Sequence, residues 1–237
     1  MADHARKVII YAYRLTSDSG SAPCIYDLRG SPTEILTLAC CKGGQIRKGK
    51  GIHWGMRHFI GKQHQSEIAD GATDVYVMGI YEKKLLYFAK LTEVLSMEDY
   101  YAPQSRYKNR HDYIYEISAD PPKRNNNNPA FHPKEDTEQH MRDWLGKYAL
   151  VSNCFAYFGK EAPPIPIDFL DSLSIPRSYK SFNGESPDGK RIMEFVKAIW
   201  DFRIAIQNEP HDFQRGNSRK GCVKREGNSV TKRVRHR

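Results

Sequence analysis

The most informative stretch of this chain is Leu36-Thr37-Leu38-Ala39-Cys40-Cys41-Lys42, an apolar run followed by two thiols and a cationic turn. The run does not alternate between apolar and polar residues, which is typical of a strand buried on both faces, so we expect a strand over residues 35–41. Successive side chains of a strand point to opposite faces, so Cys40 and Cys41 are not expected to bind one metal ion together. The sequence therefore predicts a buried strand that ends in groups capable of chemistry.

Further strands are predicted on both sides of this stretch, from runs rich in β-branched and aromatic residues. Residues 74–81 and 84–95 are two such runs, and the short polar break at Glu82-Lys83 predicts a hairpin between them. The remaining runs are 7–15, 148–152 and 154–158. We expect an α+β fold with a mostly antiparallel, hairpin-rich sheet that could close into a small barrel.

Helices are predicted at three places. Ser96 is a candidate cap with Asp99 in the capping-box position, and residues 163–173 carry apolar side chains at helical spacing. Ser186-Pro187-Asp188 combines a capping serine, a proline at the first helical position and an acid that the helix dipole favours. Apolar residues then recur at helical spacing up to Ile206, which predicts an amphipathic C-terminal helix packed on the body.

Three segments lack these patterns. Residues 48–73 are rich in His and Gly and predict a long inserted loop with at most one helical turn, and residues 120–128 predict an exposed loop. Residues 211–237 hold nine Lys and Arg against two acids, without apolar periodicity, which predicts a disordered basic tail behind a single domain at 1–210. Most of the net charge of +9 lies in that tail, so the body is not expected to be a basic nucleic-acid platform.

The composition also bears on the cellular compartment. No apolar run approaches the roughly 18 residues of a membrane span, and the polar N-terminus shows no signal peptide, so no membrane partner is expected. Five cysteines, three of them close in sequence, argue against a secreted disulfide framework. We therefore expect a cytoplasmic protein.

An ordered series of blocks resembles the nucleotide modification associated domain 2 family. The blocks are Asp18 to Cys24, Leu36 to Lys42 with Ile46-Arg47, Asp74 to Gly79, Leu86 to Glu93, Arg106 to Tyr115, and Val151 to Gly159. The resemblance implies an association with modified bases of DNA in phage and bacterial gene neighbourhoods, without assigning a reaction. Two departures are the insertion 48–73 and Tyr76, which stands where the family usually has Trp.

Two groups of residues are candidates for binding a ligand. Lys42 and Arg47 follow the strand end, where Gly43-Gly44 lets the backbone approach a phosphate closely; a solvated turn is the alternative. Arg14 and Cys24 complete this first group. In the second, Arg106 and Arg110 could grip a phosphate and Tyr115 could stack on a base; a surface ion pair is the alternative.

Four residues are candidates for catalysis. Asp18 or Asp112 could be a general base, Cys41 could be a nucleophile activated by a neighbouring cation, and His132 could shuttle a proton. A turn-forming Asp, a buried structural Cys and a surface His are the alternatives. No cofactor or metal is assigned, although Cys24, one thiol of the pair and a histidine of the insertion could bind zinc.

These candidates predict one cavity walled by residues 18–24, 40–47 and 106–115. The expected function is recognition of a nucleotide or nucleic-acid base, with group transfer or hydrolysis at a base or glycosidic bond as a possible reaction. A non-catalytic reader of modified bases in DNA or RNA is the alternative, and a phage or defence interaction protein is a second one. The cationic turn and the basic tail would contact nucleic-acid phosphates.

Overall fold

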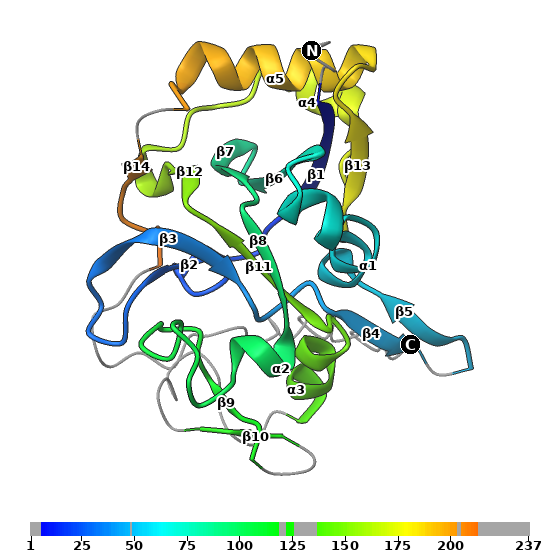
Figure 1. The fold of residues 1–237 in the computed structure, drawn as a ribbon. Helices are drawn as coiled ribbons and strands as arrows, with labels where there is room; N and C mark the ends of the chain where they lie inside the picture. The colour runs from blue at the N-terminus through cyan, green and yellow to red at the C-terminus, as the bar shows by residue number, and fades with distance from the viewer. Residues whose placement is uncertain (1–5, 48, 119–121, 126–136, 203–204, 213–237) are drawn as a thin grey trace, which may run out of the picture.

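Two sheets, of six and four strands, form the body of the molecule (Figure 1). The computed structural model describes residues 6–47, 49–118, 122–125, 137–202 and 205–212. Helices and antiparallel-rich sheets are both present, so the predicted α+β class is confirmed. The sheets remain open and do not close into a barrel.

The six-stranded sheet has the order β13-β1-β6-β7-β12-β14. Its pairs are antiparallel except for β1 with β6 and β12 with β14. The predicted hairpin at Glu82-Lys83 is confirmed, and both turn residues have positive φ, as a tight hairpin turn requires. The strands are β1 (Lys7–Arg14), β6 (Thr73–Tyr81), β7 (Lys84–Lys90), β12 (Cys154–Tyr157), β13 (Lys180–Asn183) and β14 (Ile206–Gln207).

The four-stranded sheet has the order β2-β3-β11-β8 and is antiparallel throughout. Its strands are β2 (Cys24–Tyr26), β3 (Pro32–Leu38), β11 (Tyr148–Ser152) and β8 (Glu93–Ser96). The single strand predicted over 84–95 is therefore two strands in different sheets, because the chain leaves β7 after Lys90. The strand predicted over 35–41 ends at Leu38, so the two adjacent thiols lie in the turn after β3.

Helices cover both faces of the six-stranded sheet. On one face α4 (Ile167–Leu173) and α5 (Pro187–Ile199) bury Leu170 and Ile192 against Phe88, at the top of Figure 1. On the other face α1 (Met56–Ala69) packs with the four-stranded sheet in a second core. The short helices are α2 (Met97–Tyr100), α3 (Thr137–Trp144) and η1 (Gly159–Glu161). None of the helices in the described part of the chain is long and apolar enough to cross a membrane.

The predicted helix caps are confirmed. The Ser96 hydroxyl accepts a hydrogen bond from the backbone N–H of Asp99 at 2.9 Å, as a capping box requires. The Ser186 hydroxyl accepts from the N–H of Gly189 at 3.1 Å, and Pro187 is the first residue of α5. Helix α5 ends at Ile199, although the apolar residues at helical spacing in the sequence continue to Ile206.

The prediction of a loop over 48–73 is wrong, because this segment contains β5 (Gly51–Trp54) and the fourteen-residue helix α1. Part of the buried face of α1 is polar or small, so the sequence shows no apolar stripe. The Arg57 guanidinium is buried on backbone carbonyls, and Gly61 lies directly under the ring of Tyr148. The prediction of a loop over 120–128 is wrong in part, since β10 (Lys123–Arg124) pairs with β9 (Tyr115–Glu116).

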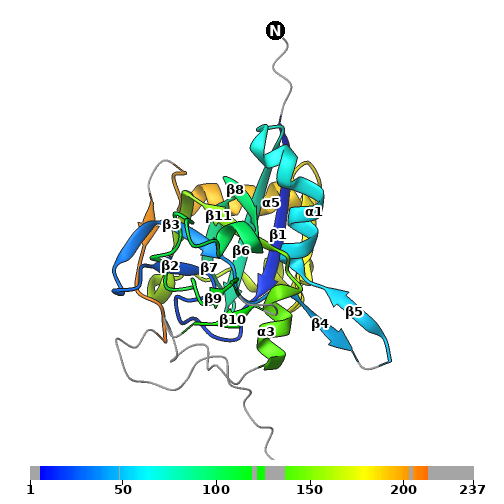
Figure 2. The same cartoon turned by 60° about the horizontal axis from the view of Figure 1, so that its bottom comes forward.

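Strand β5 pairs with β4 (Gly44–Arg47) in a two-stranded ribbon, which we call the β4–β5 arm. The arm projects from the body in Figures 1 and 2. Most of the predicted basic tail, residues 213–237, lies outside the described residues. The last two described residues, His211 and Asp212, donate backbone hydrogen bonds to Asp18, so the described chain ends against the body.

Candidate functional site

A cavity of about 690 Å³ opens where β1 ends. Its walls come from the loop after β1, the turn after β3, the base of the β4–β5 arm, the first residues of α1, helix α3 and residues 176–179. Segments far apart in the sequence therefore meet at one place, which is the usual arrangement of a binding site on a rigid framework. The arm and α3 lie side by side in Figures 1 and 2.

The charge of this cavity is one-sided. The described residues that line it include five Lys and Arg side chains and one His, but no Asp or Glu: Arg14, Lys42, Arg47, Arg142, Arg177 and His53. Concave surfaces lined by one sign of charge concentrate the electrostatic field and raise the local concentration of counter-ions. The cavity is therefore suited to an anionic ligand.

Lys42 lies at the centre of this cationic group. Its Nζ donates to the carbonyl of Arg177 at 2.6 Å and to that of Arg14 at 3.4 Å, and it lies 4.4 Å from the ring centroid of Tyr13. An ammonium has three N–H donors, so one remains for a ligand. Burial lowers the pKa of Lys42 to about 8, and the nearby Arg177 charge also acts to lower it.

Arg14 adds a second cation to this region. Its Nε is buried and has no hydrogen-bond partner among the described residues. A buried donor without an acceptor costs roughly 1–3 kcal/mol. The Nε is closed to solvent, so Arg14 contributes the charge of its side chain to the cavity rather than this donor. The backbone of Arg14 is fixed, because its N–H donates to the carbonyl of Pro176 at 3.2 Å.

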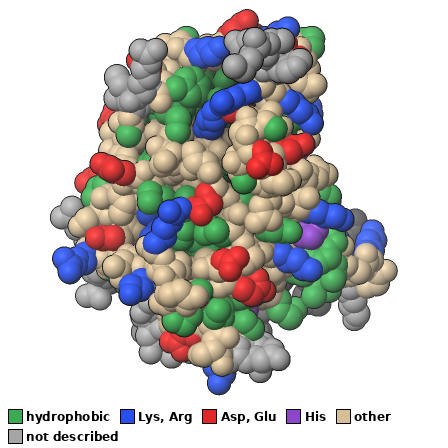
Figure 3. Space-filling model, viewed as in Figure 1, with side chains coloured by type: hydrophobic (Ala, Val, Ile, Leu, Met, Phe, Trp, Pro, Cys, Tyr) green, Lys and Arg blue, Asp and Glu red, His purple; other side chains and the backbone are tan. Residues whose placement is uncertain are grey.

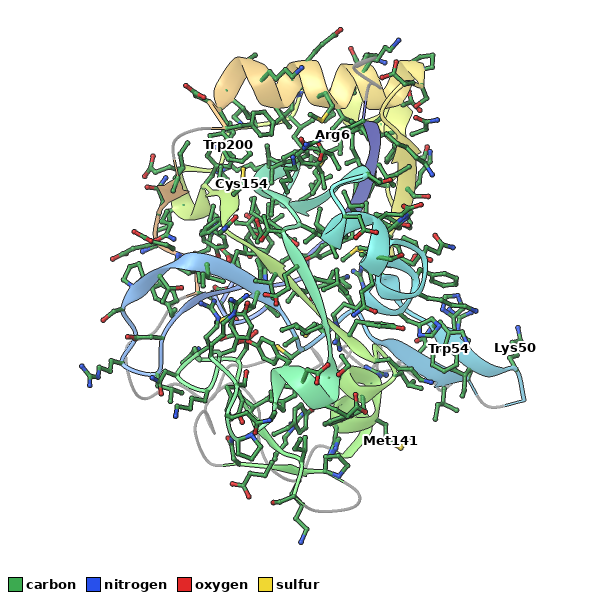
Figure 4. All side chains as sticks on the ribbon, viewed as in Figure 1. Arg6, Lys50, Trp54, Met141, Cys154 and Trp200 are labelled. Atoms are coloured by element: carbon green, nitrogen blue, oxygen red, sulfur yellow. The ribbon has the colours of Figure 1, made fainter. Side chains whose placement is uncertain are left out.

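Three aromatic rings line the cavity, and each contacts a further side chain outside it. Trp54 stacks on His58 with a centroid distance of 4.2 Å. Tyr179 lies 5.9 Å from the ring of Phe59, and the Tyr13 hydroxyl is hydrogen-bonded to that of Tyr87 at 2.8 Å. Trp54 and Tyr179 are thus rigid apolar surfaces on which a base could stack, whereas the buried Tyr13 ring is covered by Lys42. Figure 4 labels Trp54 on the β4–β5 arm.

Cys41 brings a thiol to the cavity in an unusual backbone conformation. Its φ of 62° lies in the left-handed region, which costs a non-glycine residue roughly 1–3 kcal/mol and must be imposed by the surroundings. Asp143 accepts a hydrogen bond from the Cys41 N–H, and Arg57 donates one to its carbonyl, both at 2.7 Å. The Gln139 amide lies 3.8 Å from the sulfur. Two buried charged side chains thus fix the turn that carries this thiol.

Glycines allow the neighbouring segments to approach this turn. A Cβ on Gly43 would lie 2.0 Å from the carbonyl oxygen of Arg142, and a Cβ on Gly55 would lie 2.2 Å from that of Lys42. Any larger residue would push α3 or the start of α1 away from the turn. The Gly43-Gly44 pair therefore brings backbone against backbone, while the adjacent side chains line the cavity.

Four of the residues predicted from the sequence meet at this cavity: Arg14, Cys41, Lys42 and Arg47. Asp18 lies beside it but is only 2% exposed, and its carboxylate accepts hydrogen bonds from the Tyr157 hydroxyl and from His211 Nδ1, the latter at 2.8 Å. Cys24 is fully buried, and burial raises the pKa of its thiol to about 12. His132 lies outside the described residues.

The predicted residues between 106 and 115 do not line the cavity. Arg110 donates to the Cys24 carbonyl at 2.6 Å, and Asp112 accepts from the Tyr100 hydroxyl at 2.7 Å, both in the protein interior. Tyr115 donates to Asp143 at 2.9 Å, and Arg106 is exposed and paired with Glu93. Residues 106–115 therefore attach a loop to the four-stranded sheet. The cavity wall that was predicted for this segment is formed instead by residues 176–179 and α3.

Five further residues line the cavity although no pattern in the sequence predicted them: Trp54, Gln139, Arg142, Arg177 and Tyr179. The juxtaposition of a cation and an aromatic ring in Pro176-Arg177-Ser178-Tyr179, between a helix and a strand, was the only local signal that could have indicated one of them. Within the described ranges no three His, Cys, Asp or Glu side chains are placed to hold a metal ion.

Comparison with known proteins gives one family match. No curated protein and no solved structure matches the chain. The model of the nucleotide modification associated domain 2 family matches residues 7–217, which include every residue of the cavity. The chain therefore belongs to the nucleotide modification associated domain 2 family.

Proposed function

We propose that the cavity binds a nucleotide, with its phosphate on the cationic group around Lys42 and its base against the aromatic rings. The observation that carries this proposal is the set of five Lys and Arg side chains without a carboxylate among the described lining residues. The family name, which associates the domain with nucleotide modification, supports it. A volume of about 690 Å³ also lies in the range of small-molecule sites.

The phosphate subsite is assigned to Lys42, Arg14 and Arg177. Lys42 touches the backbone of both arginines and retains one donor, and both arginines line the cavity. Two or three charge-assisted hydrogen bonds of this kind would fix the phosphate. Trp54 and Tyr179 then supply faces for the base, while the buried Tyr13 ring holds Lys42 in place.

A second candidate function, modification of the bound base by nucleophilic catalysis, is favoured by Cys41. Its thiol lies in the cavity next to Lys42, and two buried charged residues hold it in the left-handed conformation. Asp18 and Asp112, the predicted bases, are both engaged by buried hydrogen bonds, so Cys41 is the better candidate for chemistry. Substitution Cys41→Ser is expected to abolish turnover and leave binding intact, whereas a non-catalytic reader would bind the nucleotide and show no turnover even in the wild type.

The proposal is tested by calorimetry with nucleoside monophosphates and with inorganic phosphate alone. Lys42→Gln and Arg177→Gln should each weaken nucleotide binding about tenfold or more, because each removes a charged partner of the phosphate. Lys197→Gln, on the exposed face of α5, is the matched control and should bind like the wild type. Absence of nucleotide binding in the wild type, or equal affinity in all four proteins, would contradict the proposal.

A further inference from the structure

The β4–β5 arm extends the cationic surface of the cavity away from the body. Gln45, Arg47 and His53 line the cavity from one face of the arm, and β5 pairs with β4 in the register Gln45 with His53 and Ile46 with Ile52. No Asp or Glu occurs between Glu34 and Glu67 in the sequence. Among the described residues, the arm and the lining of the cavity therefore form one surface without carboxylates, and a polyanion complements it.

The opposite face of the arm is apolar and exposed. Side chains alternate along a strand, so Ile46 and Ile52 share the face that Gln45 and His53 do not occupy. Ile46 is 55% exposed and Ile52 is 48% exposed, although they are direct cross-strand partners. Hydrophobic, Lys, Arg and His side chains gather at the right of Figure 3, over the arm. A projecting apolar pair among cations is an arrangement that the fold itself does not need.

The tip of the arm is built to approach another molecule. Gly49 and Gly51 both have a φ of 73°, and a Cβ on either would meet no atom within 4 Å. Lys50 lies between them at the outer end and points away from the body in Figure 4. Lys50 lies three residues beyond Arg47, which lines the cavity, so the tip extends the cationic surface of the arm past the cavity wall.

From these observations we infer that the nucleotide bound in the cavity belongs to a nucleic-acid strand, and that the β4–β5 arm holds the nucleotides next to it. This inference rests on the proposed function and names its substrate as a polymer. Lys50 contacts a backbone phosphate, and the Ile46–Ile52 pair inserts beside a base, as apolar wedges do when they separate stacked bases. A free mononucleotide would occupy the cavity without reaching either of them.

The inference is tested by comparing a short fluorescein-labelled DNA strand, the same sequence in RNA and a nucleoside monophosphate. The wild type should bind at least one strand about tenfold or more tightly than the mononucleotide, because the arm adds contacts. Ile46→Ser/Ile52→Ser should remove about tenfold of the strand affinity and leave mononucleotide affinity unchanged. Comparing the affinities for the DNA strand and the RNA strand shows which nucleic acid the protein binds.

Salt dependence separates the two kinds of contact on the arm. Lys50→Gln should lower the slope of log affinity against log salt by about 0.7 to 0.9 for the strand, since one phosphate contact is lost. The isoleucine double variant should keep the wild-type slope. The exposed residues Ile167 and Lys197, on α4 and α5, provide the matched controls Ile167→Ser and Lys197→Gln. The C-terminal basic segment is identical in every variant, so its contribution cancels.

The outcomes distinguish the inference from the function on which it rests. If all variants of the β4–β5 arm bind the nucleic-acid strand as tightly as the control variants do, the inference is overturned, but the proposed nucleotide site is not contradicted. A wild-type dimer that Ile46→Ser/Ile52→Ser converts to a monomer in sedimentation, with unchanged strand affinity, would assign the arm to self-association and also overturn it. Arm-dependent strand binding without mononucleotide binding would support the arm and contradict the proposed nucleotide site.

Discussion

The carboxylate of Asp143 accepts a hydrogen bond from the backbone N–H of Cys41 at 2.7 Å, so helix α3 fixes the turn that carries the cavity thiol. Asp143 is fully buried and also accepts from the Tyr115 hydroxyl at 2.9 Å and from the Gln139 amide at 2.8 Å. One buried charge therefore joins the cavity turn to the polar framework beneath it. Residues that touch no ligand can in this way determine the shape of the site.

Asp143→Ala is expected to destabilise the protein by about 3–5 kcal/mol, because it leaves several buried donors without an acceptor. Urea unfolding followed by circular dichroism measures this change. The exposed Asp171, on α4, is the matched control, and Asp171→Ala should stay within about 0.5 kcal/mol of the wild type. Equal stability of the two variants would show that Asp143 does not hold the turn.

Cys41 is expected to react with iodoacetamide before the other cysteines of the body. Cys24 and Cys40 are fully buried, and burial raises the pKa of the Cys154 thiol, whereas Cys41 lines the cavity. Peptide mapping by mass spectrometry in a Cys222→Ser background should show Cys41 labelled at least about tenfold faster than Cys24. A bound nucleotide should slow this labelling. Labelling of Cys41 as slow as that of Cys40, or unaffected by a nucleotide that binds, would contradict the assignment.

Nucleotide affinity is expected to fall as the pH rises through about 8. Burial lowers the pKa of Lys42 to about 8, so the ammonium that attracts the phosphate is lost above this pH. The second phosphate ionisation, near pH 6, is already complete, so the ligand charge stays constant. Calorimetry should show a loss of about tenfold between pH 7 and 9.5, given roughly 1.5–3 kcal/mol for a charged hydrogen bond. Lys42→Gln should bind the nucleotide weakly at every pH. A wild-type affinity that does not change between pH 7 and 9.5 would contradict the role given to Lys42.

The sequence predicted those parts of the fold whose signals are local. The β6–β7 hairpin follows from Glu82-Lys83, and the start of α5 follows from Ser186-Pro187, since a turn or a cap needs only neighbouring residues. Helix α1 was missed because its buried face includes Arg57 and Gly61, whose burial depends on carbonyls and a ring from distant segments. A side chain that becomes buried through tertiary hydrogen bonds leaves no apolar period in the sequence.

The residues of the candidate site were predicted only in part, for a similar reason. Lys42 and Arg47 were found because cations beside Gly43-Gly44 indicate an approach to a ligand in one short stretch. Arg177 and Trp54 reach the same cavity only through the fold, from segments without a motif. Conversely, a cluster of Arg, Asp and Tyr has the same appearance in a sequence whether it binds a ligand or fastens a loop.

The two arginines of that cluster are expected to behave differently, although both were predicted to bind a ligand. Arg110 is buried and donates to the Cys24 carbonyl and to two threonine hydroxyls, so Arg110→Met should cost about 3–5 kcal/mol of stability. Arg106 makes an exposed ion pair with Glu93, so Arg106→Ala should cost about 0–1 kcal/mol. Neither side chain lines the cavity, so the folded fraction of each variant should bind nucleotide with wild-type affinity. Urea unfolding and calorimetry on the same preparations check both statements. A tenfold loss of nucleotide affinity in Arg106→Ala would show that this segment is part of the binding site.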